Sequence, residues 1–126
     1  MSLSVIDRND VALRGRLAGP VELRELPSGD TLLVFRLTVR RPAPPPRAAR
    51  PREPGQDTIT CVSFGKALIT RSAAWQPGDL LEVEGSLRRR FWRTPTGRAV
   101  AHEVDCRRAR KCRVPTRRAE PELDAG

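Results

Sequence analysis

Residues 78–97 predict a long β-strand followed by a turn, and they limit the fold more than any other part of the chain. Alternate residues of a strand share a face. One face of this segment carries apolar or small residues, namely Leu81, Val83, Gly85 and Leu87. The other face carries polar, cationic and aromatic residues, namely Ser86, Arg88, Arg90 and Trp92. Two interpretations stay open: a surface whose guanidinium groups neutralise phosphates while the indole stacks on bases, or a barrel strand with an ordinary basic solvent face.

Length and charge narrow the class of protein. The chain has 126 residues, enough for one small barrel or sandwich domain. Its net charge is +9, and residues 86–113 hold ten basic residues against Glu103 and Asp105. Such a patch favours a polyanion, either nucleic acid or an anionic membrane surface. No apolar run approaches the roughly 20 residues of a membrane span, and residues 1–10 lack a signal-peptide pattern. We therefore expect a cytoplasmic, nucleoid-associated protein with no membrane partner.

The basic residues are almost all arginine, and the cysteine and histidine content is low. Only Lys66 and Lys111 among the 24 basic residues are lysine, and arginine pairs with phosphate and stacks on bases. A compositional bias of the source genome is an alternative cause. The three cysteines show no CxxC spacing and His102 is the only histidine, so no metal site and no cofactor are predicted. Three reduced thiols are expected, with a cross-link between subunits as the alternative.

Hydrophobic periodicity predicts an all-β fold with one helix. Strands are expected at residues 9–17, 31–40 and 58–64, with a short extended piece at 21–26. A helix is expected at 66–75, where Trp75 covers the barrel, and a final hairpin pairs 79–93 with 98–107 across a turn at 94–97. Five strands with one short helix between the third and fourth correspond to the OB-fold, a Greek-key barrel that binds oligonucleotides.

A proline-rich segment interrupts this pattern. Residues 42–57 contain six prolines with Arg47, Arg50 and Arg52, and they predict a flexible arm that is either functional or a tolerated insertion. We take residues 1–112 as the OB-fold domain. Residues 113–126 mix proline, arginine and acidic residues and are expected to be a short disordered tail.

Five sequence fragments keep their order and separation in a way that resembles the bacterial single-stranded DNA-binding proteins. The fragments are NDVALRGRLAG, PSG, FRLTV, VSFGKAL and PGDLLEVEGSLRRRFW. The resemblance implies an OB-fold that assembles as a homotetramer, a dimer of dimers. It also implies that Phe64 and Trp92 stack on bases, although Phe64 in the core and Trp92 at the rim are alternatives. Basic residues near these two are predicted phosphate contacts: Arg24, Arg36, Arg40, Lys66, Arg88 and Arg90.

The chain departs from that family at three places. Pro42 and Thr58 stand where the family usually carries further aromatic residues. The sequence given ends at Glu122-Leu123-Asp124-Ala125-Gly126 and lacks the family's acidic tail tip. The resemblance then implies a secondary paralogue in which tail-mediated recruitment of repair enzymes is in doubt.

The function predicted from the sequence is binding and protection of single-stranded DNA in replication, repair or recombination, without strong sequence preference. No phosphate loop, HExxH motif or nucleophile elbow is present, so the protein is not expected to be an enzyme. The alternatives are an OB-fold that binds RNA or serves as a primosome-type accessory, and a protein-interaction barrel. The oligomeric state follows from the resemblance alone.

Overall fold

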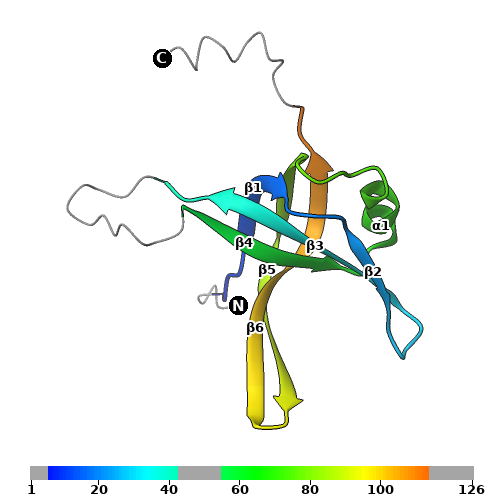
Figure 1. The fold of residues 1–126 in the computed structure, drawn as a ribbon, viewed down its shortest axis with the longest axis vertical. Coiled ribbons are helices and arrows are strands. Elements are labelled where there is room, and N and C mark those ends of the chain that lie inside the picture. The colour runs from blue at the N-terminus through cyan, green and yellow to red at the C-terminus, as the bar shows by residue number, and fades with distance from the viewer. Residues whose placement is uncertain (1–5, 43–54, 114–126) are drawn as a thin grey trace, which may run out of the picture.

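One six-stranded sheet curls on itself to form the barrel in the computed structural model, which describes residues 6–42 and 55–113 (Figure 1). The elements in chain order are β1 (Val11–Leu17), β2 (Glu22–Glu25), β3 (Thr31–Arg40), β4 (Gln56–Ser63), α1 (Lys66–Ser72), β5 (Leu80–Thr94) and β6 (Gly97–Lys111). The strand order is β1-β5-β6-β4-β3-β2, and a further β1–β3 pairing closes the barrel. The predicted OB-fold class is confirmed. The extended piece at 21–26 contains β2, which pairs with β3 and brings the strand count to six instead of five.

The barrel core is built from the alternation that the sequence shows. Leu33, Phe35 and Leu37 of β3 are buried together with Leu81 and Val83 of β5. This agrees with the faces that the sequence predicts for both strands.

Trp75 covers one end of this core, as predicted. It is 6% exposed, and its ring meets Phe35 edge to face at a centroid distance of 5.2 Å. The helix itself ends earlier than expected, at Ser72. The residues after it continue in a tighter turn, in which Trp75 N donates to Ser72 O at 3.0 Å.

Two glycines allow the strands to approach closely. A Cβ at Gly15 would lie 2.6 Å from Thr38 O, where β1 crosses β3 to close the barrel. A Cβ at Gly85 would lie 2.1 Å from Asp105 O. Here the register shifts between Glu84 and Gly85, so that β6 contains one extra residue in a β-bulge.

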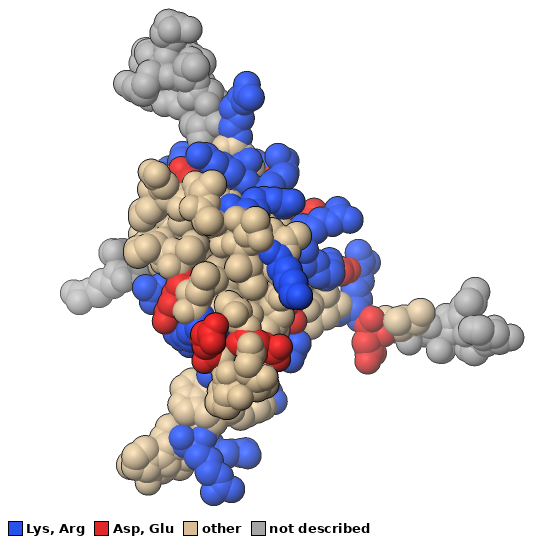
Figure 2. All heavy atoms as spheres, turned by 90° about the vertical axis from the view of Figure 1, so that its right-hand side faces the viewer, with Lys and Arg blue, Asp and Glu red and all other residues tan. Residues whose placement is uncertain are grey.

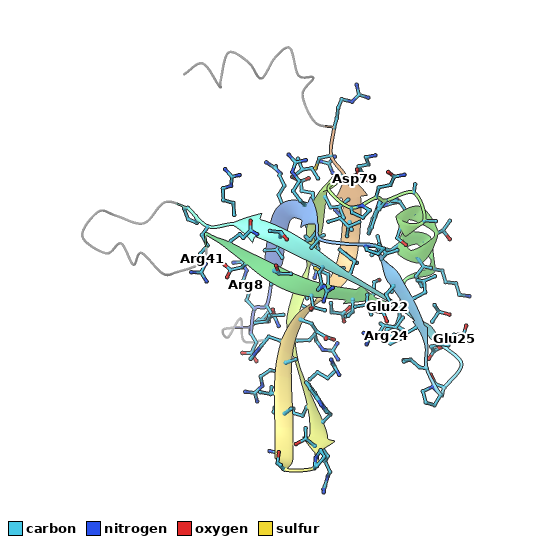
Figure 3. All side chains as sticks on the ribbon, in the orientation of Figure 1. Arg8, Glu22, Arg24, Glu25, Arg41 and Asp79 are labelled. Atoms are coloured by element: carbon cyan, nitrogen blue, oxygen red, sulfur yellow. The ribbon has the colours of Figure 1, made fainter. Side chains whose placement is uncertain are left out.

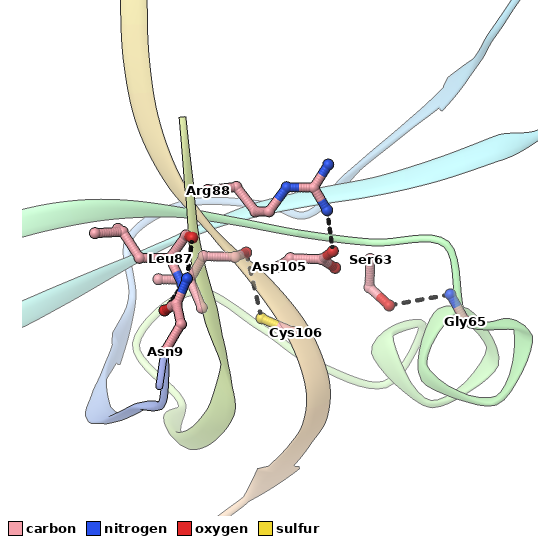
Figure 4. Close-up of polar contacts among 8 residues, drawn as sticks. Asn9, Ser63, Gly65, Leu87, Arg88, Asp105 and Cys106 are labelled. Atoms are coloured by element: carbon pink, nitrogen blue, oxygen red, sulfur yellow. Dashed lines mark hydrogen bonds and ion pairs between the residues drawn. The ribbon is translucent and has the colours of Figure 1, made fainter. Parts of the chain in front are cut away.

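Beyond this bulge, β5 and β6 leave the barrel as a two-stranded projection that we call the hairpin arm, residues 88–103 (Figure 1). In the described part of the chain, the arm's strands pair only with each other. Leu87 lies at its base and shares a face with Leu81 and Val83, yet it is 48% exposed. Asn9 fixes this base through two hydrogen bonds of 2.8 Å, one donated to Leu87 O and one accepted from Leu87 N (Figure 4).

Strand boundaries correct the predicted limits of the proline-rich arm and the last strand. Gln56 and Asp57 belong to β4 and pair with the end of β3, so they are not part of a loop. The base of this segment is held by Arg41, whose Nη2 lies 2.7 Å from Asp57 Oδ1. That contact lowers the pKa of Asp57. The last strand reaches Lys111 instead of residue 107. Residues 43–54 and 114–126, and with them the predicted flexibility, lie outside the described residues.

The cysteines are reduced in the structure. Cys61 and Cys106 are buried and Cys112 is partly exposed. A hydrogen bond with Cys61, together with burial, raises the pKa of the Cys106 thiol. The predicted alternative of a cross-link between subunits therefore narrows to Cys112. Among residues 6–42 and 55–113, no helix has the length and apolar character needed to cross a membrane.

Candidate nucleic-acid interface

A groove of about 520 Å³ lies on the outer face of β2, β3 and β4, beside the base of the hairpin arm. Its floor includes Val34 and Val62, which are paired across β3 and β4 and point away from the core. Five of the eight residues predicted to bind nucleic acid line it: Arg24, Arg36, Phe64, Arg88 and Arg90. The groove thus joins residues that are up to 66 positions apart in the sequence.

Phe64 lies where β4 turns into α1. Its side chain is 54% exposed, so the alternative that places it in the core is wrong. The buried Ser63 side chain accepts a hydrogen bond from Gly65 N at 3.0 Å, which fixes the turn on both sides of the ring (Figure 4). An exposed aromatic ring on the wall of a groove is suited to stacking on a base.

Trp92 lies on the hairpin arm, on the same face as Arg88 and Arg90. It is 41% exposed, and the Cζ atom of Arg90 lies 4.7 Å from its ring centroid. Trp92 itself does not line the groove, but two neighbours on its face do. The arm therefore continues the groove face beyond the barrel, while base stacking by Trp92 stays a prediction.

The arginines of the groove are paired with carboxylates, which sequence reasoning missed. Arg88 Nη1 lies 3.0 Å from Asp105 Oδ2 (Figure 4), and Arg90 Nε lies 3.3 Å from Glu103 Oε1. On β2, Arg24 Nε lies 3.0 Å from Glu22 Oε2 (Figure 3), and this hydrogen bond lowers the pKa of Glu22. Four arginines and three carboxylates line the groove, so its net charge is far smaller than the sequence suggests.

The remaining predicted phosphate contacts differ in position. Arg36 lines the groove and forms no ion pair within the described residues, although its charge also lowers the pKa of Glu22. Lys66 is the exposed first residue of α1, two positions after Phe64. Arg40 is exposed at the end of β3. Neither Lys66 nor Arg40 lines the groove.

The ten basic residues of 86–113 do not form one patch. Strand alternation sends Arg89 and Arg98 to the face of the arm opposite Trp92, where they surround Phe91. A further group lies at the end of β6: Arg107, Arg108, Arg110 and Lys111. In Figure 2, Lys and Arg atoms accordingly gather at the end of the arm and again over the opposite end of the molecule. Sequence reasoning gave Phe91 no role, although the same alternation that placed Trp92 would have placed it.

Metal chemistry has no support in the described ranges. No group of three or more His, Cys, Asp or Glu side chains in residues 6–42 and 55–113 could hold a metal ion.

Comparisons with known proteins agree with the fold and with this site. Residues 8–111 match the model of the single-strand binding protein family. The single-stranded DNA-binding protein of Thermotoga maritima is 35% identical over 98 residues, which cover 76% of this chain and 67% of that protein. A solved structure described as Plasmodium falciparum SSB complex with ssDNA has a TM-score of 0.70 at 18% identity, and covers 90% of this chain and 100% of its own. The structural likeness supports the OB-fold, and the family match extends over every element from β1 to β6. The chain therefore belongs to the single-strand binding protein family.

Proposed function

We propose that this protein binds and protects single-stranded DNA along the groove and the adjoining face of the hairpin arm, in replication, repair or recombination. The observation that carries the proposal is the groove itself. It places the exposed ring of Phe64 among Arg36, Arg88 and Arg90 on the sheet face of an OB-fold, in a chain whose relatives are named for binding single-stranded DNA.

The mechanism requires no catalysis. Guanidinium groups replace the counterions of the phosphate backbone, while aromatic rings stack on unpaired bases of any identity. Because stacking does not depend on the base, sequence preference should be weak. We further propose that the protein acts in the cytoplasm, at the nucleoid, as a homotetramer built as a dimer of dimers, which is the assembly implied by the family resemblance.

The test is a titration of the protein with oligo(dT) at several salt concentrations, followed by tryptophan fluorescence. Affinity should fall with salt, with a log–log slope of about 0.7 for each phosphate contacted. Replacing Trp92 with Ala should remove most of the quenching and weaken binding by about 1–3 kcal/mol. An affinity that does not change with salt would contradict the mechanism.

Competition with an RNA oligomer of the same sequence tests the alternative ligand. DNA should compete at least as well as RNA. A clear preference for RNA would indicate recognition of the 2′-hydroxyl and an RNA-binding function instead.

A further inference from the structure

We propose that the hairpin arm carries a second base-stacking site on the face opposite Trp92, formed by Phe91 with Arg89 and Arg98, and that its ligand is single-stranded nucleic acid. This inference depends on the proposed function, and it adds a site on a face of the molecule that the groove does not include.

The register of the arm places these residues together. Phe91 is paired with Val100, Arg89 with His102 and Arg93 with Arg98. Directly paired residues of an antiparallel ladder lie on the same face. The Cζ atom of Arg89 lies 4.7 Å from the Phe91 ring centroid and that of Arg98 lies 5.6 Å from it. The ring is nevertheless 49% exposed, so part of its surface is open to a base.

The two faces of the arm differ in their ion pairs. On the Trp92 face, Arg88 and Arg90 are bonded to carboxylates at 3.0 and 3.3 Å. On the Phe91 face, Arg89, Arg93 and Arg98 form no ion pair with any residue in 6–42 or 55–113. Cations without carboxylate partners attract phosphate without first having to break an ion pair.

The views of the whole molecule agree with this difference. In Figure 2 the end of the arm shows Lys and Arg atoms and no Asp or Glu atoms on the face in view. Figure 3 shows side chains that leave the arm on both of its sides. A flexible strand that reaches the arm on the Trp92 face can therefore pass over the two-stranded arm and meet a second ring and a second set of cations.

Nucleic acid fits this face better than a second copy of the chain does. Leu87 and Val100 are also exposed here, each 48%, and by themselves they would suit an apolar partner. However, burial of the three cations of this face against an apolar surface would leave charges without partners, which is strongly unfavourable. A polyanion with stacked bases satisfies the ring and the guanidinium groups together.

The experiment moves the indole from one face to the other. The first variant is Trp92→Phe, in which the buried Trp75 remains as a constant background. The second carries Trp92→Phe together with Phe91→Trp, so that both faces keep an aromatic ring and the reporter lies on the new one. Oligo(dT) is added in lengths below and above the ~4–16 nucleotides that one OB-fold covers. We expect quenching of the relocated indole, at least with the longer oligomers.

Affinity supplies the second measurement. Phe91→Ala should weaken binding of a long oligomer roughly 5- to 150-fold, the range for the loss of one stacked base. Val100→Ala is the matched control, since it removes apolar surface from the same face without removing a ring, and it should change affinity less than twofold. Both side chains are about half exposed, and circular dichroism verifies that each variant folds.

The possible outcomes separate the two proposals. Quenching in the wild type but not of the relocated indole, with unchanged affinity of Phe91→Ala, would refute the second site and leave the proposed function intact. A protein that binds no oligomer in any form would refute both. If Phe91→Ala changes the mass measured by light scattering while its affinity for DNA stays the same, the face binds another copy of the chain and the inference is wrong.

Discussion

Arg88 donates a hydrogen bond from Nη1 to Asp105 Oδ2 at 3.0 Å, inside the groove that we propose for DNA. A phosphate must therefore compete with this carboxylate for the guanidinium group. The carboxylate is also an anion that repels the DNA backbone. Asp105→Asn removes both effects, so we expect affinity for oligo(dT) at low salt to rise by about 0.2–1 kcal/mol, the range measured for exposed ion pairs. Fluorescence titration measures this change.

Glu84→Gln provides the matched control for that variant. Glu84 is paired with Arg108 at 3.8 Å on another part of β5 and β6, and it does not line the groove. Its replacement should change affinity less, because only the general charge of the protein changes. Weaker binding by Asp105→Asn would show that the carboxylate instead holds Arg88 in its binding position.

Phe64 and Leu23 offer a second matched pair, since both side chains are 54% exposed. Only Phe64 lines the groove. Phe64→Ala should weaken binding of oligo(dT) by about 1–3 kcal/mol, because one stacking platform is lost. Leu23→Ala removes a similar exposed apolar side chain from β2 and should have little effect. Equal losses in the two variants would mean that Phe64 makes no specific contact with a base.

The two tryptophans should have opposite effects when they are replaced. Trp75 is 6% exposed and packs against Phe35, so Trp75→Ala should lower the free energy of unfolding by about 3–5 kcal/mol. Chemical denaturation measures this loss. Trp92→Ala removes a side chain that is 41% exposed and should change stability much less. If Trp92→Ala were as destabilising as Trp75→Ala, the arm would have a structural role that its exposure does not indicate.

Alternation along the chain was sufficient to predict which residues of β3 and β5 share a face. Leu33, Phe35 and Leu37 point into the core as expected. Alternation does not show what covers a face, however. Leu87 follows Leu81 and Val83 in phase, but it lies where β5 has already left the barrel, and it is therefore exposed.

The ion pairs of the groove required the register as well as the phase. Arg88 is opposite Glu103, and Ser86 is opposite Asp105, only because the two strands meet at a two-residue loop between Thr94 and Gly97. Sequence reasoning placed the turn correctly but did not count the pairs back from it. The bulge is harder to predict, because it depends on the close approach of Gly85 to Asp105. It makes Arg107 an extra residue between the partners of Glu84 and Gly85, and it brings Arg107 and Arg108 to the surface as neighbours.

Glu82 should make stability depend on pH in the acid range. Its Oε2 accepts hydrogen bonds from Arg14 Nε at 3.1 Å and Arg14 Nη2 at 2.5 Å, and its Oε1 accepts one from Arg110 Nη2 at 2.6 Å. The hydrogen bond with Arg14 is the main cause that lowers the pKa of Glu82 below its ordinary value of 4.5. Because the folded state favours the ionised carboxylate, this stabilisation is complete above pH 4.5. It is lost as the pH falls through the lowered pKa.

Glu82→Gln should therefore have a lower Tm than the wild type at pH 7, and the difference should shrink below pH 4.5 and disappear once Glu82 is protonated in both states of the wild type. Thermal unfolding between pH 2 and pH 7 at low ionic strength measures this, since salt screens such an exposed pair. Arg14→Gln removes the main partner of Glu82 and should show the same convergence with the wild type. A difference in Tm that stays constant across the acid range would mean that the variant loses packing and not the interaction of Glu82 with its two arginines.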